Sequence, residues 1–228
     1  MNYKVLIQGP LNKTSLSNLD YYRQFGDIVI SFWDSDDKSL LDNVDLTNVQ
    51  LISQPLPQKT ILQNIRGHNT FIYHVYSVLK GLELINNKYV IRTRSDERYG
   101  NLIPLLNKFE SNQNKEVVCA NIFFKKWSWR PCHMGDHLYI CRTSLLRDAF
   151  EYIINNHDKF HGVDPETAIA WAILDTLGLP RIKHNFVQTF DVIDTNLLAP
   201  FVARWHHANI TYIDKFYNDD IITNMSEL

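Results

Sequence analysis

Several features that would point to a particular class of protein are scarce in this sequence. It has three cysteines, Cys119, Cys132 and Cys141, an odd number without the spacing of a common metal site. Buried free thiols in a reducing compartment are therefore favoured over a disulfide framework. No apolar run approaches the length of a membrane span. Residues 1–7 begin directly with a strand pattern and not with a signal peptide, so we expect a cytoplasmic protein.

An excess of charge is also missing. The formal net charge is −2 among 228 residues, which gives no general attraction to nucleic acid or to an anionic membrane. The chain has no linker, internal repeat or low-complexity tract. Hydrophobic residues make up 45% and aromatic residues 12%, enough for a buried core. We expect one domain over residues 1–228.

Apolar periodicity predicts strands and helices in alternation. Strand patterns in the first half occupy residues 5–8, 27–33, 49–52 and 88–94, and helical patterns lie at 15–25 and 61–86. The second half predicts strands at 116–124, 138–141 and 186–193 and helices at 144–155 and 164–177. This order favours an α/β fold in which helices flank a mostly parallel sheet.

The most informative stretch is residues 88–99, where a strand runs into mixed charges. Asp96 and Glu97 stand next to each other among Arg92, Arg94 and Arg98. Mg²⁺ and Mn²⁺ are commonly held by one or two carboxylates together with substrate phosphates, and guanidinium groups suit phosphate. A surface cluster of salt bridges is the alternative. The strands at 5–8, 28–31 and 90–94 all end in polar residues, and such ends gather at one edge of a parallel sheet, where ligands bind.

These pieces occur in the order of a known family. A strand ends in Gln8-Gly9-Pro10, a second strand covers 28–33, the stretch 63–66 leads into a helix, and the fourth strand ends in Arg94-Ser95-Asp96. In this the chain resembles the WavE lipopolysaccharide-synthesis family and the small glycosyltransferase domains of large algal viruses. The resemblance implies a single GT-A (Rossmann-like) glycosyltransferase domain. Its nucleotide-binding half would be residues 1–100, and its acceptor-side half residues 101–228.

The resemblance also implies a metal and nucleotide-sugar site. In GT-A enzymes a strand-end Asp-x-Asp binds the metal and the diphosphate, whereas this chain has Ser95-Asp96-Glu97 followed by Arg98. Asp96 and Glu97 are predicted to hold Mn²⁺ or Mg²⁺, and a late histidine, His207, to complete the shell. The residues predicted to contact the nucleotide sugar in this half are Gln8, Gly9, Pro10, Trp33, Arg66, Arg94 and Ser95. Trp33 can equally be a core residue at a strand end.

A second polar cluster precedes the strand at 138–141. By the resemblance, the loop of Gly135 and Asp136 lies beside donor and acceptor, so both are candidates for sugar contacts, and glycine allows close approach of the backbone. A zinc site of Cys132, His133 and His137 is an alternative, although the spacing matches no common zinc pattern. An ordinary polar turn is another.

The start of the helix at 164–177 supplies the predicted catalytic base. An inverting transferase needs a carboxylate to take the proton from the acceptor hydroxyl. GT-A enzymes place it at a helix start after the glycine-containing loop, so the resemblance points to Glu166, or else Asp164. We predict Asp164 as the helix cap and Glu166 as the base. Acids in a first helical turn are also commonplace caps and dipole partners.

The sequence thus predicts a metal-assisted, inverting glycosyltransferase of polysaccharide biosynthesis. It would move a sugar from a nucleotide-sugar donor, preferably a UDP-sugar, to a hydroxyl of a glycan acceptor. The aromatic and basic loop 125–130 is predicted to be an acceptor platform in preference to a nucleic-acid site, because the overall charge is near neutral. Two other classes remain: a sugar-nucleotide nucleotidyltransferase, and a carbohydrate-binding protein without catalysis.

Overall fold

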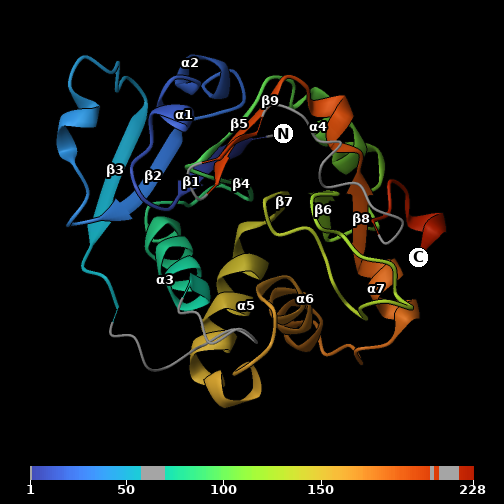
Figure 1. Cartoon of the computed structure of the whole chain (residues 1–228). Coiled ribbons are helices and arrows are strands. Elements are labelled where there is room, and N and C mark those ends of the chain that lie inside the picture. The colour runs from blue at the N-terminus through green and yellow to red at the C-terminus, as the bar shows by residue number, and fades with distance from the viewer. Residues whose placement is uncertain (1, 58–69, 206–207, 211–220) are drawn as a thin grey trace.

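A mostly parallel sheet organises the chain. The structure is a computed structural model, and it describes residues 2–57, 70–205, 208–210 and 221–228 (Figure 1). Within them the large sheet has seven strands in the order β3-β2-β1-β4-β7-β6-β8. These are β1 (Tyr3–Gln8), β2 (Ile28–Trp33), β3 (Val49–Gln54), β4 (Tyr89–Arg94), β6 (Val117–Ala120), β7 (Leu138–Arg142) and β8 (Phe190–Ile193).

The direction of each strand decides what lies at each edge of this sheet. β1 pairs in parallel with β2 and β4, β2 with β3, and β6 with β8. β7 runs antiparallel between β4 and β6. The predicted α/β fold with a mostly parallel sheet is confirmed.

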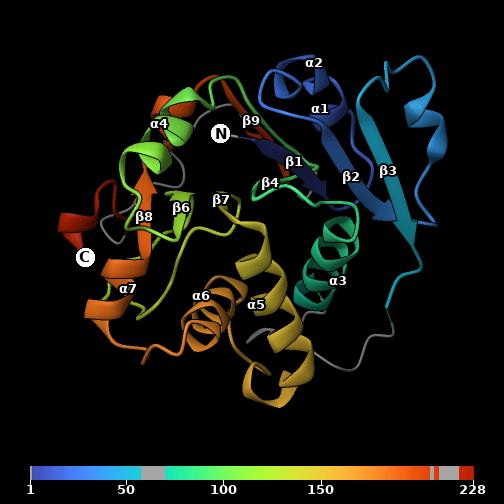
Figure 2. The same ribbon diagram turned by 180° about the vertical axis from the view of Figure 1, so that it is seen from behind.

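Helices cover both faces of the sheet (Figures 1 and 2). Side chains alternate along β1, so Leu6 packs into the core beneath α3, α5, α6 and α7, while Val5 and Ile7 pack on the other side with α1, α2 and α4. The helices are α1 (Lys13–Leu16), α2 (Leu19–Tyr22), α3 (Thr70–Leu82), α4 (Ile103–Ser111), α5 (Thr143–Asn155), α6 (Pro165–Thr176) and α7 (Lys183–Thr189); short 3-10 turns cover Lys38–Leu41, His157–Lys159, Thr195–Leu198 and Met225–Glu227. None of the described helices is long and apolar enough to cross a bilayer.

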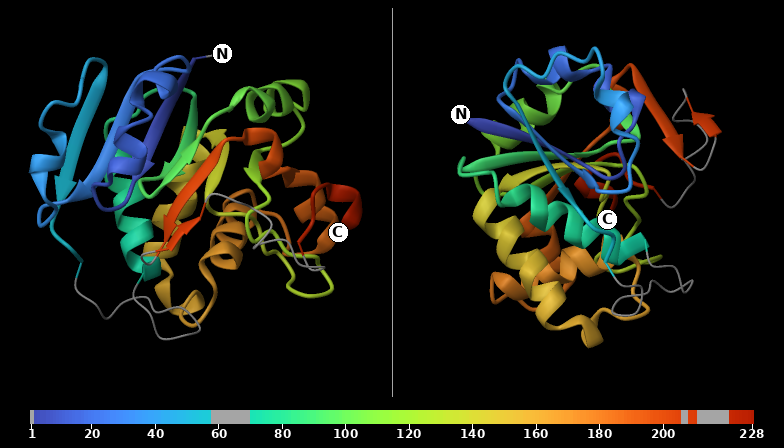
Figure 3. Two further views of the ribbon diagram at one scale, coloured as in Figure 1. Left: turned by 45° about the horizontal axis from the view of Figure 1, so that its top comes forward. Right: turned by 90° about the vertical axis from the view of Figure 1, so that its left-hand side faces the viewer.

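A small antiparallel sheet lies against the face that carries α4 (Figure 3). It has the order β10-β9-β5, from β5 (Glu97–Tyr99), β9 (Phe201–Trp205) and β10 (Ala208–Ile210). The sequence patterns did not predict this sheet or α4. β5 matters most here, because it begins directly after the turn of Ser95 and Asp96.

Three predicted elements differ from the structure, and for a fourth, the helix expected at 61–86, residues 61–69 lie outside the described residues and α3 ends at Leu82. The helix expected at 15–25 is two short helices, and the strand expected at 116–124 ends at Ala120. The strand expected at 186–193 is helical as far as Thr189. Phe186 and Phe190 are four residues apart in the sequence, a spacing that puts both side chains on one face of a helix or of a strand. In the structure their rings stack, with centroids 4.6 Å apart.

Candidate active site

The candidate site is a cavity of about 290 Å³ at the edge where β1, β2 and β4 end. Its lining comes from these strand ends, from α3, from the residues before β7 and from the start of α6: Gln8, Gly9, Pro10, Trp33, Tyr73, His74, Ser77, Arg94, Ser95, Asp96, Asp136, His137, Pro165 and Glu166. A larger cavity of about 600 Å³ lies at the opposite edge, near Lys88 and Arg142. We locate the site in the smaller cavity, because the clustered carboxylates and histidines line it.

The ends of β1 and β4 are joined closely at this edge. Gln8 pairs with Arg94 in the parallel register, and the backbone N–H of Ser95 donates to the Gln8 carbonyl at 2.9 Å. Gly9 has φ +117°, and a Cβ there would lie 2.8 Å from Ser95 Oγ. Glycine at this position therefore lets the first turn pass beside Ser95 and leaves backbone open to the cavity. The prediction that Gln8, Gly9, Pro10 and Ser95 share one site fits this geometry.

Arg94 and Asp96 form a two-pronged ion pair in the cavity. Arg94 Nε donates to Asp96 Oδ1 at 2.9 Å, and Nη2 donates to Oδ2 at 2.8 Å. Burial alone would lower the pKa of Arg94, but its contacts with Asp96 and Glu97 raise it overall. Arg94 is therefore a fixed positive charge. Both oxygens of Asp96, the predicted metal ligand, already accept hydrogen bonds from it.

Glu97 does not line the cavity, contrary to its predicted role as a metal ligand. Its side chain is fully buried (0% exposed), with Oε1 2.5 Å from His137 Nδ1 and Oε2 accepting from the Tyr99 hydroxyl at 2.7 Å. Burial alone would raise the pKa of Glu97, but His137, Arg94 and Tyr99 lower it overall. Asp96 is the last residue of the turn, and Glu97 is the first residue of β5. Neighbouring side chains along an extended chain point to opposite sides, so Asp96 lines the cavity while Glu97 faces the interior.

The antiparallel direction of β7 brings Asp136 and His137 to the cavity. Leu138, the first residue of β7, pairs with Thr93 near the end of β4, so the residues before β7 lie at the same edge. Arg92, buried in β4, donates from Nη1 to the backbone carbonyls of both Asp136 and His137. This guanidinium fixes the backbone that carries the two side chains.

Gly135 has a packing role and is not among the residues that line the cavity. A Cβ on Gly135 would lie 2.0 Å from the carbonyl oxygen of Ala120, at the end of β6. The predicted sugar contact of Gly135 is therefore not supported, whereas that of Asp136, which lines the cavity, remains a proposal.

Gly135→Ala should lower the free energy of unfolding by about 2 kcal/mol, the usual scale for overpacking. Backbone, and not a flexible side chain, would have to move. Urea unfolding measures the change. Gly162→Ala is the control, because a Cβ there meets nothing within 4 Å and only the positive φ of +77° is strained. Equal stability of Gly135→Ala and the wild type would show that the loop tolerates a side chain.

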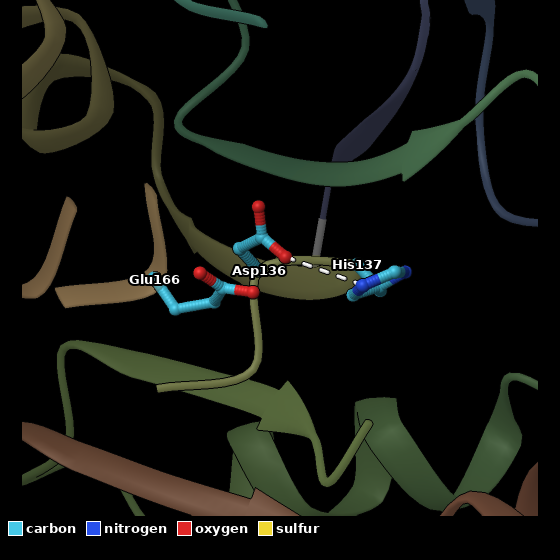
Figure 4. A group of neighbouring side chains, drawn as sticks. All are labelled: Asp136, His137 and Glu166. Atoms are coloured by element: carbon cyan, nitrogen blue, oxygen red, sulfur yellow. Dashed lines mark ion pairs between the residues drawn. The ribbon is translucent and has the colours of Figure 1, made fainter. Parts of the chain in front are cut away.

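Asp136, His137 and Glu166 form one cluster at this edge (Figure 4). One ligand atom from each lies within 4.8 Å of the others, and Asp136 Oδ1 is 3.5 Å from His137 Nε2. Burial and the neighbouring Asp136 raise the pKa of Glu166 to about 7. Burial would also raise the pKa of Asp136, but His137, His74 and Arg92 lower it overall. Two carboxylates and an imidazole are donors that Mn²⁺ accepts, so the cluster fits a divalent cation.

The first turns of α3 contribute three lining residues that the sequence patterns did not single out as site residues. His74 Nδ1 lies 3.4 Å from Asp136 Oδ2, and burial, then Arg92, lowers the His74 pKa to about 4. The Ser77 hydroxyl donates to the Gln8 side chain. Tyr73 meets Trp33 edge-on, with ring centroids 5.8 Å apart. Positions 73, 74 and 77 share one helical face, which is the signal that could have indicated them.

Asp164 stands at the N-cap position of α6, as predicted, but its side chain makes no capping hydrogen bond. Its carboxylate pairs with Arg130 instead, and Asp164 is not among the residues that line the cavity. Glu166, in the first turn of the same helix, does line it. Of the two predicted bases, Glu166 lines the cavity and Asp164 does not, so Asp164 is not supported as the base.

The loop 125–130 does not line the cavity either. Trp127 packs on Phe186, with ring centroids 5.7 Å apart, whereas Trp129 is 60% exposed. The zinc alternative of Cys132, His133 and His137 is not formed, since the described residues place His137 with Asp136 and Glu166. Cys132 is buried, which raises the pKa of its thiol to about 11. The predicted site residues Arg66 and His207 lie outside the described residues.

Comparison with known proteins shows the fold. No protein-family model matches the chain, and no curated protein matches it by sequence. The structure is similar to 4-diphosphocytidyl-2C-methyl-D-erythritol synthase from Anaerococcus prevotii, at 9% identity over 94% of each chain with a TM-score of 0.53. It is similar at a TM-score of 0.47 to glucosyl-3-phosphoglycerate synthase from Mycobacterium tuberculosis, solved with Mn²⁺, UDP and phosphoglyceric acid, at 13% identity over 78% of this chain and 79% of the other. HddC from Yersinia pseudotuberculosis matches at a TM-score of 0.41, at 11% identity over 65% of this chain and 80% of the other.

Identities this low carry the fold and no activity, and the WavE resemblance remains a prediction. The chain is a Rossmann-like α/β domain whose polar strand ends form a candidate active site.

Proposed function

We propose that the protein transfers a sugar from a nucleotide-sugar donor, with UDP as the preferred nucleotide, to a hydroxyl of a glycan acceptor. The observation that carries the proposal is one cavity that joins Gln8-Gly9-Pro10, Trp33, Arg94-Ser95-Asp96 and Glu166. These residues lie at or just after the carboxyl ends of parallel strands, or in the first turn of a helix at that edge. Nucleotides bind at this edge in open α/β sheets.

The lining suits the parts of such a donor. Trp33 and Tyr73 give an aromatic wall against which a base can stack. Gly9 offers backbone without a side chain, and Arg94 supplies a permanent positive charge for a diphosphate. Asp136 also lines the cavity, where it would accept hydrogen bonds from sugar hydroxyls.

The proposed reaction is a single displacement. The acceptor hydroxyl oxygen bonds to the anomeric carbon, while the bond from that carbon to the diphosphate oxygen breaks. The electron pair leaves with the nucleoside diphosphate, and the configuration inverts. The hydroxyl proton passes to a carboxylate that lines the cavity. Among the described residues, the carboxylates that line the cavity are those of Asp96, Asp136 and Glu166. The sequence predicts that Glu166 is the one that takes the proton. A divalent cation at this edge would offset the negative charge that grows on the leaving diphosphate.

The right donor should stabilise the folded protein. At a donor concentration 100 times the dissociation constant, binding adds about 2.7 kcal/mol to the free energy of unfolding. For a chain of this size the melting temperature should then rise by several degrees. We would screen UDP-, GDP-, CMP- and dTDP-sugars with and without Mn²⁺, and then measure free nucleotide released from the donor that stabilises the protein.

Nucleoside diphosphate release that increases with a glycan acceptor is the expected result. Exchange of pyrophosphate into a nucleotide sugar would instead identify a nucleotidyltransferase. A donor or glycan that binds without any turnover would identify a carbohydrate-binding protein.

A further inference from the structure

The metal site predicted from the sequence does not coincide with the cluster that the fold assembles. We propose that Asp136, His137 and Glu166 together hold a divalent cation, Mn²⁺ or Mg²⁺, and that Glu97 orients His137 from behind. The inference rests on the proposed function for the use of the ion, but its test needs no turnover.

The three donors come from two elements that the fold brings together. Asp136 and His137 precede β7, and Glu166 lies in the first turn of α6. Their ligand atoms lie within 4.8 Å of one another, and Asp136 is only 4% exposed (Figure 4). Asp136 and Glu166 both line the cavity, so phosphate oxygens can complete the coordination that the side chains begin.

Groups behind the cluster fix the orientation of these donors. Glu97 Oε1 lies 2.5 Å from His137 Nδ1, which leaves Nε2 on the side of Asp136. A carboxylate on the remote ring nitrogen is the usual partner of a histidine that binds a metal. Arg92 holds the backbone carbonyls of Asp136 and His137. The ligands are therefore positioned before any ion arrives.

His74 is an independent observation at the same place. Its side chain is 10% exposed and lines the cavity, with Nδ1 3.4 Å from Asp136 Oδ2. Its Nε2 is buried and has no hydrogen-bond partner. A buried polar atom without a partner, in a residue that contacts Asp136 and lines the cavity, calls for an explanation, and an ion held beside it by Asp136 is one. The nearby carboxylates of Asp136 and Glu166 also repel each other, and a cation between them removes that repulsion.

The site predicted from the sequence is less suited to an ion. Both oxygens of Asp96 accept hydrogen bonds from Arg94, so a cation there would have to displace a guanidinium. The carboxylate of Glu97 is fully buried against His137 and Tyr99. With Glu166 on the cation, Asp96 is the described lining carboxylate that remains for the acceptor proton.

The test is titration of EDTA-treated protein with Mn²⁺ alone, followed by calorimetry and by the electron paramagnetic resonance of free Mn²⁺. The wild type should bind one Mn²⁺. Asp136→Asn and Glu166→Gln should each weaken binding at least about tenfold, and Glu97→Gln by about 10- to 100-fold. Asp96→Asn should keep the wild-type affinity. Glu116→Gln is the matched control, since Glu116 is a carboxylate paired with Arg142 at the opposite edge.

Thermal unfolding in EDTA checks that each variant is folded before titration. Failure of the wild type to bind Mn²⁺ would overturn the inference, and so would loss of binding in Asp96→Asn with retention in Glu166→Gln. Donor turnover, measured separately, distinguishes this failure from failure of the proposed function. Turnover without any bound Mn²⁺ would support the proposed sugar transfer and contradict the proposed cation site.

Discussion

Replacing Glu97 with leucine is expected to lower the free energy of unfolding by about 3 kcal/mol, the scale for removing one partner of a buried ion pair. Glu97 is fully buried, and among the described residues its carboxylate meets His137, Arg94 and the Tyr99 hydroxyl. Leucine has a similar volume but no oxygen, so each of these groups loses a partner, and the buried His137 and Tyr99 lose it away from water. Urea unfolding at neutral pH measures the difference.

Two comparisons show whether burial of the charge is the cause. Glu116 pairs with Arg142 at 2.8 Å, with both side chains more than 30% exposed, so Glu116→Leu should cost less than about 1 kcal/mol. Glu97→Gln keeps the shape and one acceptor oxygen, so it should be more stable than Glu97→Leu. Equal costs for Glu97→Leu and Glu116→Leu would mean that the buried pair contributes no more than a surface pair.

The edge of the sheet could be predicted from the sequence because it depends on local patterns. Short apolar runs that end in Gln8-Gly9-Pro10 or in Arg94-Ser95-Asp96 indicate strands and their carboxyl ends. Parallel alternation then places these ends together. Gln8, Trp33, Arg94 and Asp96 all line the cavity for this reason.

The distribution of roles within the site could not be predicted, because it depends on tertiary contacts. Nothing local shows that Glu97 begins a strand of a second sheet and faces His137, forty residues away. The alternation of apolar residues predicts that a segment is a strand but not in which direction it runs. Only the antiparallel direction of β7 puts Asp136 at the cavity. Asp164 and Glu166 look alike in sequence, but Arg130 pairs with Asp164 while Glu166 faces the cavity.

These contacts separate two kinds of carboxylate in one small cavity. Asp136 and Glu166 are close enough to share a cation with His137, whereas Asp96 is paired with a guanidinium. A carboxylate bound to a cation is a weaker base, and Asp96 would stay off the proposed cation. On the inference above, Glu166 would hold the cation and Asp96 would accept the acceptor proton, the reverse of the roles predicted from the sequence.

Excess Mn²⁺ should separate the two residues in turnover. Glu166→Gln is expected to lose activity at low Mn²⁺ and to recover most of it when Mn²⁺ is raised above the weakened dissociation constant. Asp96→Asn should lose about 10²- to 10⁴-fold in kcat at every Mn²⁺ concentration, the usual scale for a missing general base. The measurement is nucleoside diphosphate release at saturating donor across a range of Mn²⁺ concentrations.

Asp96→Asn removes the basic carboxylate with little other change, because the amide oxygen can still accept one hydrogen bond from Arg94 and the side chain keeps its shape. Arg94→Lys serves as a control for lost phosphate binding: it should raise KM for the donor more than it lowers kcat. The opposite pattern, in which Mn²⁺ restores Asp96→Asn and leaves Glu166→Gln inactive, would return the cation to Asp96 and the base to Glu166. Thermal unfolding of both variants must accompany the titration, because an unfolded Asp96→Asn would also be inactive at every Mn²⁺ concentration.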